Sequence, residues 1–296
     1  MQQLLGIAPQ VLFGQLLIGL INGAFYAMLS LGLAVIFGLL NIINFAHGAL
    51  YMMGAFVAWF LLQYLGLGYW PALILSPLIV GIFGAAIERT LLRRLYHLDH
   101  LYGLLLTFGL ALMIQGVFQR YFGSSGQPYT IPSLLQGGVN LGFMVLPIYR
   151  GWVVAVSLVV CLATWFVIER TSLGAKLRAA TENPRLTQAF GINVPRLITL
   201  TYAFGVALAA FSGVLAAPIF QVSPLMGADL IIIIFAVVVI GGMGSIMGSV
   251  VTGFALGVVE GLTKFFYPEA SNTVIFVIMA IVLLIKPAGL FGRAHA

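Results

Sequence analysis

The sequence predicts an all-α polytopic membrane protein with about eight or nine transmembrane helices. Hydrophobic residues make up 62% of the 296-residue chain and charged residues only 7%. A soluble domain carries roughly 25% charged residues, so this chain has more apolar surface than a core of its own can bury. The apolar residues also gather in successive runs of about 20 residues, the length that crosses a bilayer. The short alternating segments of a membrane β-barrel are absent.

Several functional classes are excluded by composition. Cys161 is the single cysteine, so a disulfide framework or a cysteine metal site is not expected. The net charge of +6 reflects the placement of basic loops in a membrane protein, not a nucleic-acid partner. The first ten residues lack a basic region, and we expect no cleaved signal peptide. The sequence has no phosphate-binding loop of the Gly-x-x-x-x-Gly-Lys-Ser/Thr type, which predicts a chain without ATPase activity or a cofactor of its own. No second histidine or carboxylate lies at metal-ligand spacing near His47, so we also expect no metal site.

The hydropathy pattern divides the chain into nine candidate spans. They cover residues 11–37, 48–65, 71–88, 102–120, 151–168, 197–217, 229–247, 249–266 and 272–286. Glycines and polar residues at their ends make the first and the seventh span candidates for broken or re-entrant segments.

Basic residues predict the orientation. One cluster lies at residues 89–94, a second at 170–196, and Lys286 and Arg293 follow the last span. By the positive-inside rule these three regions are cytoplasmic. The segment 121–150, rich in Gly, Pro and Ser, is then an outer loop.

The cytoplasmic loop 169–196 is the most polar part of the chain. Ser172 is a candidate cap for a short helix that runs to about Thr181. A second helix start follows, because Asn183 is a favoured N-cap residue and Pro184 is favoured at the first helical position.

The second loop helix should cover residues 184–190, since Gly191 is a natural helix stop. At 1.5 Å per residue it is about 10 Å long. Leu186, Ala189 and Phe190 fall on one side of it. Such a short helix with an apolar stripe docks either in the lipid headgroup region or on another protein.

Two glycine-rich breaks interrupt the apolar runs. The first is the segment "NIINFAHG" at 41–48, and the second is "IGGMGSIMG" at 240–248. Paired interruptions in the two halves of a chain predict inverted repeats with discontinuous helices, here about 11–120 and about 197–290. The alternative is plain helix packing, because small residues let helices approach closely.

Broken backbone at membrane depth is tolerated where it is buried in protein or lines a cavity, and intramembrane polar residues often mark a solute path. The residues expected to line such a path are Asn22, Tyr26, Asn44, Phe45, His47, Gly48, Gly241, Gly242, Gly244, Ser245 and Glu260. Two of them have alternative interpretations. Glu260 is either a gate or assembly contact, or a carboxylate that pairs with Lys264 one turn later. His47 either contacts solute or satisfies backbone groups in the break.

Four segments resemble LivH-like permeases of high-affinity branched-chain amino acid ABC importers. They are "NGAFYAMLSLGLAVIFGLLNIINFAHGALYMMGA", "LRAATENPRLTQAFGINVPR", "VVVIGGMGSIMGSVVTGFALGVVEGL" and "KPAGLFGR". The similarity runs over nearly the whole chain in the expected order.

The resemblance implies a multi-pass subunit of the bacterial inner membrane. Its partners would be a second, related permease, two ATP-binding cassette subunits that hold ATP and Mg, and a periplasmic solute-binding protein. The loop helix would then be the coupling helix that seats on an ATPase. The resemblance assigns coupling to Arg178, Glu182, Asn183, Pro184, Arg185, Leu186, Phe190 and Gly191. The solute would be a branched-chain or other small amino acid, or, in the alternative, urea or a short amide.

Two further classes remain as alternatives. A stand-alone channel or secondary transporter usually carries several intramembrane ionisable groups, whereas Glu260 is nearly alone here. An intramembrane protease using Ser245 and His47 lacks a third group to orient the histidine.

Overall fold

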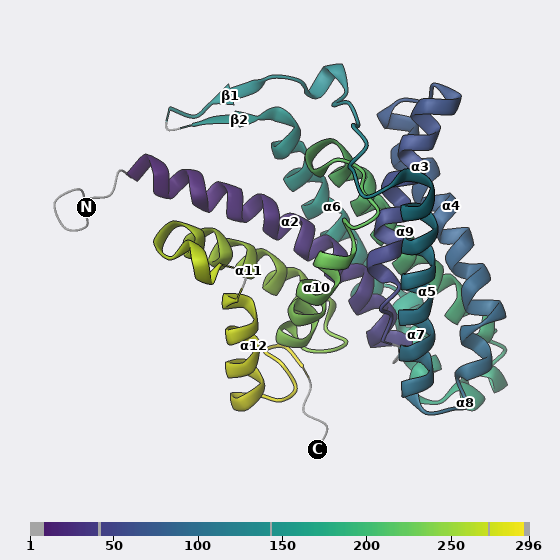
Figure 1. The fold of residues 1–296 in the computed structure, drawn as a ribbon. Coiled ribbons are helices and arrows are strands. Elements are labelled where there is room, and N and C mark those ends of the chain that lie inside the picture. The colour runs from purple at the N-terminus through teal and green to yellow at the C-terminus, as the bar shows by residue number, and fades with distance from the viewer. Residues whose placement is uncertain (1–8, 41–42, 143, 272, 293–296) are drawn as a thin grey trace. The chain divides into compact units, whose positions relative to one another are not determined.

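The computed structural model describes residues 9–40, 43–142, 144–271 and 273–292, and this part of the chain is mostly helical (Figure 1). The all-α prediction is therefore confirmed. The α-helices are α2 (Pro9–Leu40), α3 (His47–Leu65), α4 (Tyr69–Thr90), α5 (His100–Phe122), α6 (Ile148–Arg170), α7 (Ser172–Glu182), α8 (Pro184–Ala189), α9 (Val194–Phe220), α10 (Ala228–Gly241), α11 (Ile246–Phe266) and α12 (Val274–Ile285). Short 3-10 helices are η1 (Leu92–Leu95), η2 (Ser133–Leu135) and η3 (Pro268–Ala270). Of the residues discussed above, Asn41, Ile42 and Arg293 lie outside the described part.

Each of the nine predicted spans corresponds to a helix in the described residues. Seven of these helices are long and apolar enough to cross a membrane. The other two, α10 with 14 residues and α12 with 12, are shorter. A span needs about 20 residues, so the seventh predicted span is short, as a re-entrant segment would be.

Three boundaries differ from the prediction. The first span is not broken, because α2 continues for 32 residues; its glycines pack against neighbouring helices instead of ending the helix. The span predicted at 229–247 ends at Gly241, where two glycines with positive φ follow. Thr171, not Ser172, occupies the cap position of α7.

The predicted outer loop contains a feature that hydropathy does not show. Strands β1 (Gly138–Asn140) and β2 (Val145–Pro147) pair antiparallel, with Val139 opposite Leu146 (Figure 1). The hairpin is a small addition to an otherwise helical fold, and α6 begins directly after it.

The helices group into two compact units. One holds the described parts of Met1–Ser30, Ile131–Cys161 and Ile233–Ala296, and the other holds those of Leu31–Thr130 and Leu162–Ile232. We call them the first and the second unit. Each unit contains residues from the N-terminal and the C-terminal half of the sequence. The inverted repeat expected from the sequence stays a prediction.

The core of the second unit forms where α3, α4 and α9 lie side by side (Figure 1). Close approach depends on small residues: a Cβ atom at Gly54 of α3 would overlap the backbone of Ala210 in α9. On α4, Ser76 donates a hydrogen bond of 2.6 Å to the carbonyl oxygen of Gly54. Small residues and hydroxyl bonds of this kind hold membrane helices together, since lipid is as apolar as leucine.

The first unit uses the same device between α2 and α11. A Cβ atom at Gly253 would lie 2.5 Å from the Cα atom of Ala27, and one at Gly257 would overlap the backbone of Gly23. The Ser30 hydroxyl of α2 lies within 3.3 Å of the Ser249 carbonyl oxygen of α11, to which it can donate. These contacts keep the two helix backbones close along several turns.

Candidate functional site

The first break, between α2 and α3, is organised by Asn44. The backbone N–H of Ala46 donates to Asn44 Oδ1 at 3.1 Å, and the N–H of His47 donates to the Asn44 carbonyl at 3.2 Å. Asn44 is 1% exposed. Its side chain therefore supplies an acceptor that the backbone at the start of α3 needs.

Thr107 of α5 supports the same break and was missed by the sequence analysis. The N–H of Phe45 donates to Thr107 Oγ1 at 3.2 Å, and the Thr107 hydroxyl lies 3.2 Å from the carbonyl oxygen of Ile43. Thr107 is fully buried. The available signal was a lone threonine in the apolar first half of α5.

His47 and Gly48 open α3 and are both buried. A Cβ atom at Gly32 of α2 would lie 3.0 Å from His47 Cε1, so the imidazole packs on that glycine. A Cβ at Gly48 would overlap the carbonyl of Gly227. These contacts are what the helix-packing alternative requires; whether the same residues also contact solute stays a prediction.

The second break, between α10 and α11, contains glycines with a left-handed backbone conformation. Gly242 has φ +100° and Gly244 has φ +91°, a region that side chains with a Cβ rarely enter. Ser245 then caps α11, because the N–H of Gly248 donates to its Oγ at 3.0 Å. The glycines and the serine expected here thus have clear conformational roles.

The C-terminal segment 288–292 covers this second break within the first unit. The N–H of Leu290 donates to the Ile240 carbonyl at 2.8 Å, and the N–H of Phe291 donates to the Gly241 carbonyl at 3.1 Å. The last carbonyls of α10 are therefore satisfied by backbone from the end of the chain, not by polar side chains. Sequence reasoning used this segment only as part of a resemblance.

Tyr26 of α2 and Glu260 of α11 are brought together in the first unit. The Tyr26 hydroxyl donates to Glu260 Oε2 at 2.6 Å, and the Lys264 ammonium is ion-paired with Glu260 Oε1. Glu260 is 5% exposed. The contact predicted by the second interpretation of Glu260, its pairing with Lys264 one turn later, is therefore present. Asn22, one turn before Tyr26, is half-buried.

A second buried carboxylate, Glu88 in the last turn of α4, was not singled out from the sequence. It is fully buried and accepts hydrogen bonds from Thr199 Oγ1 at 2.5 Å and from the Tyr96 hydroxyl at 2.9 Å. Arg93 Nε lies 3.7 Å from its Oε1. Arg93 also donates to the carbonyl of Pro195 at 3.1 Å. We call these side chains the Glu88 cluster: Glu88, Arg93, Tyr96 and Thr199.

The Glu88 cluster joins α4, η1 with the residue that follows it, and the first two turns of α9. Burial, and next the negative charge of Glu88, raise the pKa of Tyr96 well above its ordinary value. Tyr96 therefore remains protonated and available as a donor. The signal in the sequence was a carboxylate directly before Arg89 and within six positions of Arg93 and Arg94.

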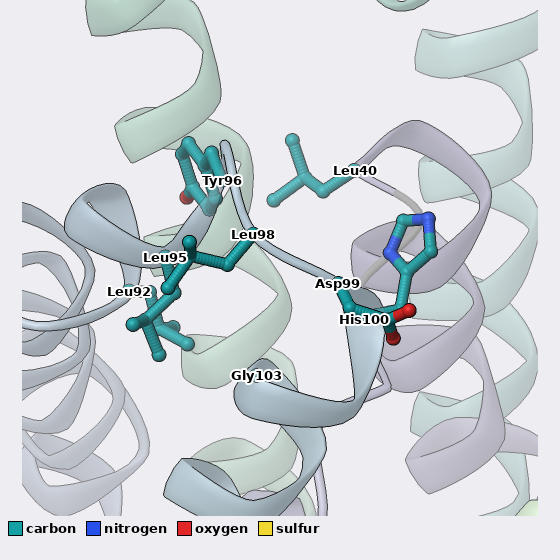
Figure 2. Close-up of a pocket in the computed structure, with 8 residues that line it drawn as sticks. All are labelled: Leu40, Leu92, Leu95, Tyr96, Leu98, Asp99, His100 and Gly103. Atoms are coloured by element: carbon teal, nitrogen blue, oxygen red, sulfur yellow. The ribbon is translucent and has the colours of Figure 1, made fainter.

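A small cavity of about 100 Å³ adjoins the cluster. Figure 2 shows its lining, with Tyr96 and the ring of His100 on opposite sides. The lining residues are Leu40, Leu92, Leu95, Tyr96, Leu98, Asp99, His100 and Gly103. Asp99 caps α5 by accepting from the N–H of Leu101 at 2.9 Å. In the described ranges, no three His, Cys, Asp or Glu side chains form a group that could hold a metal ion.

In the loop 169–196, the caps predicted for the second helix are confirmed, whereas the Ser172 cap predicted for the first helix is wrong. Asn183 Oδ1 accepts from the N–H of Leu186 at 3.0 Å, and Pro184 occupies the first helical position of α8. Gly191 has φ +81°, as a left-handed stop requires. The helix ends one residue earlier than predicted, with Phe190 as its C-cap.

The buried and exposed faces of α8 are now defined. Thr187 is buried and its hydroxyl lies 2.9 Å from the carbonyl of Ala179, which fixes α8 on α7. Leu186 is 55% exposed and Phe190 is 77% exposed. Two large apolar side chains therefore project from the most polar loop of the chain.

The remaining coupling candidates divide into two groups. Arg178 is used inside the loop, where it donates to the carbonyl of Ile168 at 3.0 Å and lies 3.6 Å from Glu169. Glu182 and Arg185 are exposed beside the apolar pair. Only the second group is freely available for contact with another molecule.

Interrupted apolar helices, small-residue helix contacts and an exposed loop helix define the class: a multi-pass α-helical membrane transport protein. The chain matches the family described as "Branched-chain amino acid transport system / permease component" over residues 15–283. It belongs to this family, and it is accordingly an inner-membrane permease.

Individual relatives agree over nearly the full length. The chain is 32% identical to the high-affinity branched-chain amino acid transport system permease protein BraD of Pseudomonas aeruginosa, covering 94% of this chain and 95% of BraD. It is 30% identical to LivH of Salmonella typhimurium, with the same two coverages. LivM of that organism is 26% identical, over 90% of this chain and 67% of LivM. Two permease proteins of one named transport system, LivH and LivM, are thus both similar to this chain.

Proposed function

We propose that this chain is a permease subunit of an ATP-driven importer that moves branched-chain or other small amino acids across the inner membrane. The chain itself handles no nucleotide; ATP and Mg are bound by two partner ATPase subunits. The observation that carries the proposal is α8, a capped helix with exposed Leu186 and Phe190 in a polar loop. An exposed apolar pair of this kind needs a docking partner.

The other partners follow from the family relationship. A second permease, related in the way LivM is related to LivH, completes the translocation unit. A periplasmic solute-binding protein docks on the outer side, where segment 121–150 with its β1–β2 hairpin is available. Selection among amino acids, urea and short amides then depends largely on that protein.

The coupling movement has a defined route inside the second unit. α8 leads through Gly191 to Asn193, whose side chain caps α9 by accepting from the N–H of Arg196 at 3.1 Å. Arg93 binds the Pro195 carbonyl, and Glu88 binds Thr199 one turn later. A displacement of α8 is thereby passed to the first turn of α9 and on to α4.

The break residues remain candidates for solute contact. Asn44 is the strongest candidate among them, because its side chain is polar and almost fully buried at the start of α3. An Asn44→Leu change should lower the uptake rate while the assembled complex is still recovered. Unchanged uptake kinetics would remove Asn44 from the path.

The test of the coupling assignment uses the complex of all subunits in proteoliposomes. Leu186→Asp combined with Phe190→Asp should abolish ATP-dependent leucine uptake and weaken recovery of the ATPase subunits. Arg185→Glu should act in the same direction. The matched control is Leu134→Asp, which changes a 77% exposed leucine of segment 121–150. Because that segment is the proposed docking site of the binding protein, the control is read on recovery of the ATPase subunits, which should stay unchanged, and not on uptake.

Two results would contradict the proposal. Normal uptake by the double variant would remove α8 from coupling. Recovery of the chain without ATPase subunits, together with solute transport in the absence of ATP, would favour a stand-alone channel or secondary transporter. Uptake of urea but not leucine by the assembled complex would retain the coupling assignment and change the solute.

A further inference from the structure

A large apolar groove lies within the second unit, between α4, the α6–α7 junction and α9. Its volume is about 530 Å³. Leu78 and Ile82 of α4, Leu177 of α7, and Leu200 and Phe204 of α9 line its walls. Ile82 is 71% exposed and Leu200 is 66% exposed, so the described chain leaves the groove open. We call it the α4–α9 groove.

Each of its three walls continues into a basic residue at one end. Arg89 follows the lining residue Ala85 by four positions on α4, and Arg196 precedes Leu200 by four positions on α9. Residues four apart share a helix face, so both cations extend the lining stripes. Lys176 follows the lining residue Leu173 by three positions on α7, so it also lies on a face that lines the groove. In the part of the chain that the structure describes, these three exposed side chains take part in none of the ion pairs.

The length of the groove fits one leaflet. On α9 the lining runs from Leu197 to Ala207, and ten residues of helix rise about 15 Å. On α4 it runs from Pro77 to Ala85, about 12 Å. The hydrocarbon core of a bilayer is about 30 Å thick, so the groove covers about half of it. A crossing helix of a partner would need an apolar surface of twice that length.

We propose that the α4–α9 groove binds one acyl chain of an anionic phospholipid of the cytoplasmic leaflet. The lipid phosphate lies among Arg89, Lys176 and Arg196. The apolar walls exclude water from the chain, and the three cations distinguish an anionic headgroup from a zwitterionic one. The positive-inside rule places these cations on the cytoplasmic side, where anionic lipids attract basic residues. The proposal does not depend on which solute the permease moves.

The test measures lipid binding to the full chain by native mass spectrometry from detergent. Phosphatidylglycerol and phosphatidylcholine with the same acyl chains are titrated separately. The first phosphatidylglycerol molecule to bind should have at least about tenfold higher affinity than the first phosphatidylcholine, because three cations surround the headgroup. The headgroup variant, Arg89→Gln/Lys176→Gln/Arg196→Gln, should bring the two affinities together.

Two further variants locate the lipid. Ala85→Phe fills the groove without changing charge and should weaken binding of both lipids. Arg94→Gln/Arg120→Gln/Arg150→Gln removes three positive charges elsewhere and should retain the preference for phosphatidylglycerol.

Three outcomes would overturn the proposal. Wild-type protein that binds both lipids equally lacks the headgroup site. A phosphatidylglycerol preference that survives the headgroup variant, or binding that Ala85→Phe leaves unchanged, places the lipid elsewhere. Loss of bound lipid whenever a second permease associates would show that a protein partner, and not a lipid, occupies the groove.

Discussion

Removal of the Glu88 carboxylate should be among the most destabilising single changes in the second unit of this permease. The carboxylate is fully buried and accepts from Thr199 Oγ1 at 2.5 Å and from the Tyr96 hydroxyl at 2.9 Å. Hydrogen bonds to a charged group contribute about 1.5–3 kcal/mol each. Arg93 is 43% exposed, so water compensates this third partner in part. Glu88→Ala should therefore lower the free energy of unfolding by about 3–5 kcal/mol.

The assay is reversible unfolding of the purified chain in mixed micelles, followed by circular dichroism. Thr199→Val alone should cost about 1.5–3 kcal/mol. The double variant should cost less than the sum of the two single changes, because the Glu88–Thr199 bond can be lost only once. A double-mutant cycle measures this difference directly.

The chain offers a matched control in Glu169→Ala. Glu169 pairs with Arg178 at 3.6 Å, but both side chains are 43% exposed. Exposed pairs contribute about 0–1 kcal/mol, so this change should be mild. Equal effects of the Glu88 and Glu169 variants, or additive effects of Glu88→Ala and Thr199→Val, would refute the reasoning.

Three further predictions concern close backbone contacts. Gly54→Val should destabilise the second unit by about 1–3 kcal/mol, because the added valine side chain would overlap the backbone of α9. The control in the same unfolding assay is Gly116→Val, where nothing lies within 4 Å of the added Cβ. Tyr26→Phe should cost about 1.5–3 kcal/mol through the lost bond to Glu260, and an unchanged unfolding midpoint would contradict that bond. Gly289→Val, at φ +79°, should release the C-terminal segment from α10, with faster hydrogen exchange at its backbone amides; unchanged protection would contradict its role as a cover.

Features decided by neighbouring residues were predictable. The ends of α8 follow from Asn183, Pro184 and Gly191, because a capping side chain, a missing N–H and a left-handed glycine act within one or two turns. The two breaks were also predictable, since long apolar runs are directly followed by Asn, His and Gly in the first case and by a glycine-rich segment in the second. The repeat assignment and the solute-contact residues stay predictions.

Contacts between distant residues were not predictable in the same way. Glu88 and Thr199 are 111 positions apart, and Tyr26 and Glu260 are 234 apart. The sequence analysis singled out Glu260 and its local partner Lys264 but passed over Glu88, and it identified neither Tyr26 nor Thr199 as a partner of these carboxylates. The C-terminal segment on the second break was missed for the same reason, because backbone donors carry no sequence signal.

The sequence by itself determined the membrane class, the order of the apolar helices and their number to within one, the two interruptions and the caps of the loop helix α8. These properties depend on hydrophobic length and on local backbone chemistry, which neighbouring residues specify. Only the tertiary structure decided that Thr107 and the chain's C-terminal backbone satisfy the breaks, that Glu88 joins α4 to α9, and that one leaflet-long groove stays open. Those outcomes depend on which helix faces meet, and in helices this apolar the periodicity does not distinguish a face against protein from a face against lipid.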